Sequence, residues 1–140
     1  MKNCYNLFLD DVRTPHDVFE YTNQKEYKNL QWEIARSYDD FVNIFSHRYI
    51  HGQMPCLISF DHDLAAEHYL LGASTLYHSF DEEKVTIPTG WHTLVWLLNF
   101  YDSNDLKLPN ILIHTKNPGG AVNMYNSIRE FRDKRNLNFN

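Results

Sequence analysis

The sequence is poor in cysteine and contains no long apolar run. Of its 140 residues only Cys4 and Cys56 are cysteines, which excludes a dense disulfide scaffold and a thiolate metal cluster. They lack C-x-x-C spacing, and we expect both to be reduced thiols in the core. No apolar run approaches the roughly 18 residues that cross a membrane, and the first residues lack the pattern of a cleaved leader. We therefore expect a cytoplasmic protein without membrane contact.

Positive charge is also scarce. The 13 Lys and Arg residues are outnumbered by 18 Asp and Glu residues, for a formal charge of -5. Because nonspecific binding to nucleic acid depends on cations that neutralise phosphates, this balance argues against a broad nucleic-acid surface. A small phosphorylated ligand, such as a cyclic nucleotide or a single RNA end, remains compatible with it.

The apolar content is high enough for one folded domain over residues 1–140. Hydrophobic residues make up 43% of the chain and aromatic residues 15%, which excludes extensive disorder. Strand patterns occur within residues 5–9, 32–38, 56–60 and 110–113. Helix patterns occur within residues 39–49, where Ser37 or Asp39 provides the cap, and within 89–101 and 121–135. We expect Pro15 and residues 116–120 in loops, residues 20–30 to be irregular, and residues 65–88 to form an insert that acts as a lid.

Strands that alternate with helices predict an α/β fold. The expected architecture is a doubly wound parallel sheet of four to five strands in a three-layer α/β/α arrangement. In such sheets ligands bind beyond the carboxyl ends of the strands. That edge is therefore where functional side chains are expected.

Reactive side chains follow three of the predicted strands directly. The first strand ends in Asp10 and Asp11 with Arg13 close behind, the third in Asp61, His62 and Asp63, and the fourth in His114, Thr115 and Asn117. Because parallel strands present their carboxyl ends at one edge, we expect these groups to form one site. Ordinary polar loops are the alternative, although acids and imidazoles recur at the junctions themselves.

These residue types suit chemistry on a phosphate. Two imidazoles, His62 and His114, are able to divide general base and general acid work at neutral pH, and Arg13 is able to form two hydrogen bonds to a phosphoryl group. Amide donors from Asn117 and the Pro-Gly-Gly turn after it would add to an anion site. The carboxylates either orient the imidazoles or bind Mg²⁺ or Mn²⁺; this set is Asp10, Asp11, Asp61 and Asp63.

Further histidines and a tryptophan carry weaker signals. Trp91 and His92 begin a helix; Trp91 is expected either in the core or stacked on a base, and His92 either in the site or in solvent. The remaining histidines show no metal-ligand spacing, and we expect them at the surface: His16, His47, His51, His68 and His78.

Five segments together resemble the cyclic-phosphate processing receiver-like domains, a branch of the receiver (flavodoxin-like) fold. They are "LFLDDVRTP", "ARSYDDFV", "ISFDHDL", "TGWHTLVWLL" and "IHTKNPGGAVNM", which occur in the family's order and span most of the chain. The resemblance implies a receiver fold that handles cyclic phosphates at RNA ends or in cyclic nucleotides. His92 stands where the family pattern has an acidic residue. The residues that match the family pattern are Asp10, Asp11, Arg13, Asp61, His62, Asp63, His114, Thr115, Asn117 and Asn123.

Three functions are compatible with this site. The first is a phosphodiesterase that opens a cyclic phosphate, with His62 and His114 as acid and base, Asp11 and Asp61 in support, and Arg13 stabilising the transition state. On this hypothesis Thr115, Asn117, Asn123, Trp91 and His92 contact the substrate. The second is a signalling receiver with Asp61 as phosphoacceptor, and the third is a binder that sequesters a cyclic nucleotide without turnover.

Overall fold

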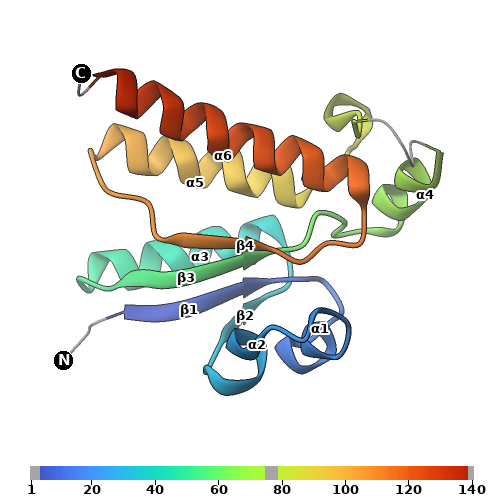
Figure 1. The fold of residues 1–140 in the computed structure, drawn as a ribbon, viewed down its shortest axis with the longest axis horizontal. Helices are drawn as coiled ribbons and strands as arrows, with labels where there is room; N and C mark the ends of the chain where they lie inside the picture. Colours follow the sequence, from blue (N-terminus) through green and yellow to red (C-terminus); the bar gives the residue numbers. More distant parts are fainter. Residues whose placement is uncertain (1–3, 75–78, 139–140) are drawn as a thin grey trace.

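A four-stranded, all-parallel sheet forms the centre of the protein (Figure 1). The computed structural model describes residues 4–74 and 79–138. The strand order is β2-β1-β3-β4, with β1 at Cys4–Leu9, β2 at Glu33–Ala35, β3 at Met54–Phe60 and β4 at Asn110–Ile113. The sequence prediction of a doubly wound, receiver-like α/β fold is thereby confirmed, with the strand number at the lower end of the expected range.

Side chains alternate across the two faces of the sheet, and both faces are covered by helices. Leu7, Leu9, Ile58 and Phe60 point to one face and belong to the main core. Phe8, one residue out of phase with Leu7, belongs to a smaller core on the opposite face. This alternation follows from the two-residue period of a strand. It explains why the central strands are mostly apolar instead of half polar.

Three helices pack on the main core and two on the other face (Figure 1). α3 (Tyr38–Ile50), α5 (Gly90–Ser103) and α6 (Pro118–Asn138) supply the main core, while α1 (Pro15–Thr22) and α2 (Lys25–Asn29) cover Phe8. The Ser37 side chain accepts a hydrogen bond from the Asp40 backbone N–H and caps α3, which selects Ser37 from the two predicted caps.

Two predicted loops are helical. Pro15 is the first residue of α1, because Thr14 and Asp17 form a capping box and proline is well tolerated in the first helical turn. Residues 20–30 are likewise not irregular, since they contain the end of α1 and the whole of α2. The Pro-Gly-Gly segment expected to be a loop forms the first turn of α6. The two loop predictions are wrong for the same reason, because Pro15 and Pro118 each begin a helix instead of breaking one. The prediction for residues 20–30 is wrong because that segment shows no clear helical period.

The predicted insert at residues 65–88 begins with α4 (Ala66–Ser74) and includes a short 3-10 helix, η1 (Glu82–Lys84). Residues 75–78, and with them His78, lie outside the described residues. His68 was predicted at the surface but is fully buried, because its two ring nitrogens bond the Leu64 backbone N–H and the Ile87 carbonyl. The histidine thus holds the two ends of the insert together.

The two cysteines correct another prediction. Cys4 and Cys56 form a disulfide with their Cα atoms 5.3 Å apart, and neither is fully buried. The bond is possible because β1 and β3 are neighbours and Cys4 pairs with Met54 near the start of both strands. This register was not visible in the sequence. No helix in the described part of the chain is long and apolar enough to cross a membrane.

Candidate functional site

The carboxyl ends of β1, β3 and β4 surround a pocket of about 220 Å³. Strand register brings these ends together, since Leu9 pairs with Phe60 and Phe60 pairs with Ile113. α4 closes one side of it. We call this the Asp61 pocket, and it is lined by Arg13, Asp61, Asp63, Tyr69, Gly72, Thr115, Lys116, Asn117 and Pro118.

Two residues that line the Asp61 pocket, Arg13 and Asp61, each have a buried side-chain atom without a hydrogen-bond partner. Among the described residues, three buried side-chain polar atoms are unpaired, and two of them are Arg13 Nη1 and Asp61 Oδ2. Leaving such atoms unpaired costs about 1–3 kcal/mol each. Both belong to residues that line the same pocket. A ligand that presents an anionic oxygen and a proton donor would satisfy both atoms.

Asp61 is positioned at the end of β3 and its acidity is shifted. Its Oδ1 accepts a hydrogen bond from the His62 backbone N–H at 2.8 Å, which fixes the carboxylate against its own strand end. Burial raises the pKa of Asp61, and the neighbouring Asp10 carboxylate adds to this, so that the pKa reaches about 7 although Arg13 opposes the shift. A carboxyl group with this pKa exchanges protons near neutral pH.

Asp10 and His114 lie behind the pocket wall as a buried pair. His114 Nε2 lies 3.0 Å from Asp10 Oδ2, and its Nδ1 lies 2.7 Å from Ser59 Oγ, which in turn bonds the Tyr27 hydroxyl. Burial lowers the pKa of His114, so the ring is neutral and donates from Nε2 to Asp10. The ring also stacks on Phe8 with centroids 4.6 Å apart. These contacts fix the tautomer and orientation of His114.

Asp10 in turn shapes the loop that carries Arg13. Its Oδ1 accepts hydrogen bonds from the backbone N–H groups of Val12 and Arg13, and Arg13 Nη1 lies 3.7 Å from its Oδ2. Burial alone would raise the pKa of Asp10, but the bonds from His114 and the two backbone groups outweigh it and keep that pKa below its usual range. Asp10 is therefore a carboxylate that orders the loop.

His62 is buried between two carboxylates and does not line the pocket. Its Nδ1 lies 2.7 Å from Asp63 Oδ1, and its Nε2 lies 3.0 and 2.9 Å from the two oxygens of Glu82. Burial alone would lower the pKa of His62, but these two acids raise it to about 9. The imidazole is thus a cation with both nitrogens engaged, an arrangement that anchors η1 to the sheet edge.

Two glycines allow helices to approach this strand end closely. A Cβ at Gly90 would lie 1.7 Å from the Asp61 carbonyl oxygen, and a Cβ at Gly120 would lie 2.3 Å from His62 Cγ. Gly90 also donates its backbone N–H to the His62 carbonyl at 2.8 Å. The first turns of α5 and α6 therefore pack directly on Asp61 and His62.

Three predicted substrate contacts lie elsewhere. Asn123 donates to Glu82 and to the Phe80 carbonyl, which ties α6 to the insert. His92 completes a capping box by accepting the Thr89 backbone N–H at Nδ1, and Trp91 donates to Ser127 Oγ. None of the three lines the Asp61 pocket.

The remaining predicted residues do belong to the pocket or its rim. Asn117 donates to Asp63 at 2.9 Å and accepts the Gly120 backbone N–H, and Thr115 accepts the Asn117 backbone N–H. Asp11 accepts a hydrogen bond from the Tyr69 hydroxyl at 3.1 Å. The Pro-Gly-Gly amides predicted to bind an anion are instead part of a helix whose first turn is capped by Asn117.

The predicted Mg²⁺ or Mn²⁺ site fits a divalent cation poorly at one of its carboxylates, Asp10. Asp10, Asp61 and His114 bring one potential ligand atom each within 4.8 Å of one another. However, both oxygens of Asp10 already accept hydrogen bonds, and the Arg13 guanidinium lies beside it. Three of the roughly four acceptor sites of the Asp10 carboxylate are occupied, so it offers few free lone pairs to Mg²⁺, which requires near-octahedral oxygen ligands. Arg13 supplies the positive charge here.

Five residues around the site were not predicted. Tyr69 lies on α4 and Glu82 on η1, both within the predicted insert at residues 65–88. Ser59 is a polar residue inside an apolar strand, a signal that was present in the sequence. Of the other two, Lys116 lies within the motif "IHTKNPGGAVNM", and Tyr21 lies outside the quoted motifs.

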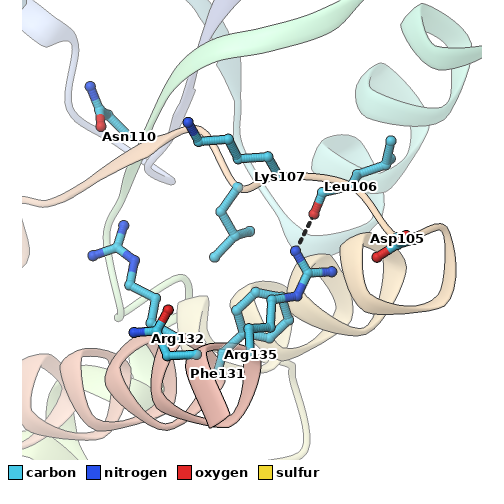
Figure 2. A pocket seen from close by; sticks show the side chains of 9 residues that line it. Asp105, Leu106, Lys107, Asn110, Phe131, Arg132 and Arg135 are labelled. Atoms are coloured by element: carbon cyan, nitrogen blue, oxygen red, sulfur yellow. Dashed lines mark hydrogen bonds between the residues drawn. The ribbon is translucent and has the colours of Figure 1, made fainter. Parts of the chain in front are cut away.

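Figure 2 shows a separate hollow at the opposite end of β4, where the strand begins. Arg135 donates there to the carbonyls of Leu106 and Tyr101, so it serves to fix the α5–β4 loop. Lys107 and Arg132 line the same hollow. It contains none of the predicted site residues, and its cations provide controls for substitutions in the Asp61 pocket.

Comparison with known proteins supports a family assignment. The family model described as the cyclic-phosphate processing Receiver domain matches residues 5–130, which include every predicted site residue. Searches of curated proteins and of solved structures found no match to the chain.

Proposed function

Because the chain belongs to the family of cyclic-phosphate processing receiver domains, we propose that it is a phosphodiesterase that opens a cyclic phosphate in the Asp61 pocket. One observation carries the proposal: Arg13 and Asp61 line the same pocket, and a buried guanidinium nitrogen of the one and a buried carboxylate oxygen of the other have no hydrogen-bond partner. A phosphoryl oxygen is the natural acceptor for Arg13. A water molecule that attacks the phosphorus is the natural donor to Asp61.

Asp61 carries the proton transfer in this reaction. In its ionised form Asp61 takes a proton from water while the water oxygen bonds to phosphorus. The bond from phosphorus to one ring oxygen breaks, and that oxygen receives the proton from Asp61. Water is consumed, a phosphate monoester with a free hydroxyl is formed, and Asp61 returns to its starting state. Its pKa of about 7 suits both steps, since both protonation states are populated at neutral pH.

The cations of the pocket stabilise the charge that develops on phosphorus. Arg13 and Lys116 line the pocket from the β1–α1 and β4–α6 loops, and Thr115 lies beside them. Preorganised donors of this kind are worth about 10²–10³-fold in rate each. His114 and His62 were predicted as acid and base. In this proposal His114 orients Asp10, and His62 binds Glu82 and so holds the insert against the sheet. Their part in proton transfer stays a prediction.

The proposal is tested with a panel of cyclic phosphates. The protein is incubated with 2',3'-cyclic mononucleotides, 3',5'-cyclic mononucleotides and cyclic oligonucleotides, with and without Mg²⁺ or Mn²⁺, and the products are separated by chromatography. The expected result is conversion of at least one of them to a monoester by the wild type and not by Asp61→Asn. Failure to turn over any of them would overturn the proposal, and tight binding with intact ligand would indicate a sequestering binder instead.

A phosphoaccepting receiver is the second candidate. Its support is the placement of Asp61 at the end of the central strand β3, with a free oxygen and Lys116 in the same pocket. Incubation with acetyl phosphate should then add one phosphoryl group, detected as a mass shift that Asp61→Asn removes. A mass shift without turnover of cyclic phosphates would favour this function.

A further inference from the structure

The side chain of Tyr21 lies beneath two cations that come from different loops. The Arg13 guanidinium carbon is 5.6 Å from the centre of the Tyr21 ring, and Lys116 Nζ is 4.3 Å from it. Tyr21 lies near the end of α1, while Arg13 precedes that helix and Lys116 follows β4. One aromatic ring therefore joins two segments that are far apart in the sequence.

The ring itself is fixed to the strand end that leads to Lys116. The Tyr21 hydroxyl donates to the His114 carbonyl at 2.6 Å. Burial raises the pKa of Tyr21 to about 12, so this hydroxyl keeps its proton over the physiological range. On the other side, Arg36 Nη1 donates to the Arg13 carbonyl at 2.7 Å and so holds the loop of the first cation. Both loops are thereby held relative to the ring.

We propose that Tyr21 is a positioning residue that holds Arg13 and Lys116 together as a two-cation clamp for the phosphoryl group. This inference rests on the proposed function for its substrate and extends it to Tyr21, which lies outside the family motifs. Two like charges repel each other, and a ring quadrupole that attracts both offsets this repulsion. The clamp supplies positive charge at the place where Asp10 fits a divalent cation poorly.

Loss of the Tyr21 ring should therefore impair phosphate binding more than it impairs the chemical step. A cation–π contact contributes about 0.5–2 kcal/mol, so loss of the ring should weaken phosphate binding by about 2–30-fold. Tyr21→Leu removes the ring, whereas Tyr21→Phe keeps the ring and removes only the bond to His114. We expect Tyr21→Leu to raise KM while kcat changes by less than about threefold. Tyr21→Phe should restore most of the affinity.

The experiment measures inorganic phosphate binding by ³¹P NMR titration together with KM and kcat for a cyclic phosphate that is turned over. Tyr125→Leu is the matched control, since Tyr125 is an exposed tyrosine on α6 that does not line the Asp61 pocket. Lys116→Gln is compared with Lys107→Gln, which removes the same charge from the hollow in Figure 2. In the double variant Tyr21→Leu/Lys116→Gln, the loss of phosphate-binding free energy should be smaller than the sum of the losses in the two single variants. The reason is that both changes act on one clamp.

The outcomes separate this inference from the proposed function. Weaker phosphate binding by Tyr21→Leu, with recovery in Tyr21→Phe, supports the clamp even if no cyclic phosphate is turned over. Turnover by the wild type with unchanged phosphate affinity and KM in Tyr21→Leu would overturn the clamp and leave the phosphodiesterase proposal intact. Equal losses in Tyr125→Leu would also overturn it, since the effect would then not be specific to this ring.

Discussion

His62 and Glu82 form a buried ion pair in which the imidazole Nε2 lies 3.0 and 2.9 Å from the two carboxylate oxygens. Glu82 also accepts hydrogen bonds from Thr89 and Asn123, so one carboxylate joins η1, the start of α5 and α6 to the end of β3. The pair explains how an insert with little core of its own is held against the site. It also gives His62 a charge that a free imidazole would lack at neutral pH.

The first prediction concerns the pH dependence of stability. The pKa of His62 is raised to about 9 in the folded protein from 6.5. The stabilisation that protonated His62 gives the folded state is therefore fully present below about pH 6.5 and is lost as the pH rises through about 9. His62→Gln should lower the free energy of unfolding by about 3–5 kcal/mol near pH 6.5, because two carboxylates lose their buried partner. Its stability should decline less than that of the wild type between pH 6.5 and 9.

Urea unfolding followed by tryptophan fluorescence at several pH values measures this difference. His16→Gln is the control, since the His16 side chain is 73% exposed and should leave the profile unchanged. Parallel profiles for the wild type and His62→Gln would show that the ion pair does not set the pH dependence.

The second prediction concerns the pH dependence of the rate. With Asp61 as the base, kcat/KM should rise with pH and level off above about pH 7, where the carboxylate is ionised. Asp61→Asn should lose about 10²–10⁴-fold in rate together with this inflection. Arg13 lowers the pKa of Asp61, so Arg13→Gln should move the inflection to higher pH. An unchanged inflection in Asp61→Asn would assign the titration to another group.

The third prediction concerns metal ions. Because Asp10 already accepts three hydrogen bonds and faces Arg13, turnover should be the same in EDTA as in Mg²⁺ or Mn²⁺. Isothermal titration of the protein with Mg²⁺ should show no binding. Activity that disappears on chelation and returns with Mn²⁺ would show that the acidic residues rearrange around a cation.

The fourth prediction concerns the disulfide. Cys4 and Cys56 are separated by 52 residues, and a bond across a loop of this size typically stabilises a fold by about 2–4 kcal/mol. Reduction, or the double variant Cys4→Ser/Cys56→Ser, should lower the urea midpoint accordingly. Turnover at low urea should not change, since the bond lies near the starts of β1 and β3, away from the Asp61 pocket. A wild-type midpoint that is insensitive to dithiothreitol would contradict the prediction.

Most of what the sequence predicts about the fold and the site comes from the strand patterns and from the residues at the strand ends. The apolar runs before Asp10, Asp61 and His114 are strands, and the parallel order brings Arg13 and Asp61 to one pocket as expected. The first helix could also have been found, because Thr14, Pro15 and Asp17 form a start signal that was present in the sequence.

Other features depend on contacts across the fold. Glu82 reaches His62 only because the insert folds back over 20 residues, and nothing in its own segment marks it as a partner. The pairing of Cys4 with Cys56 depends on the register of β1 and β3. His62 was predicted as a general acid or base, and its burial between Asp63 and Glu82 is a feature that spacing alone does not reveal.

The most direct test of the central claim is the conversion of a 2',3'-cyclic nucleotide followed by ³¹P NMR. Wild type, Asp61→Asn and the distant control Lys107→Gln are each incubated with 2',3'-cyclic AMP at pH 7.5. The account predicts that the cyclic resonance is replaced by a monoester resonance with wild type and Lys107→Gln and persists with Asp61→Asn. A cyclic resonance that persists with wild type, or that disappears equally fast with Asp61→Asn, would contradict it.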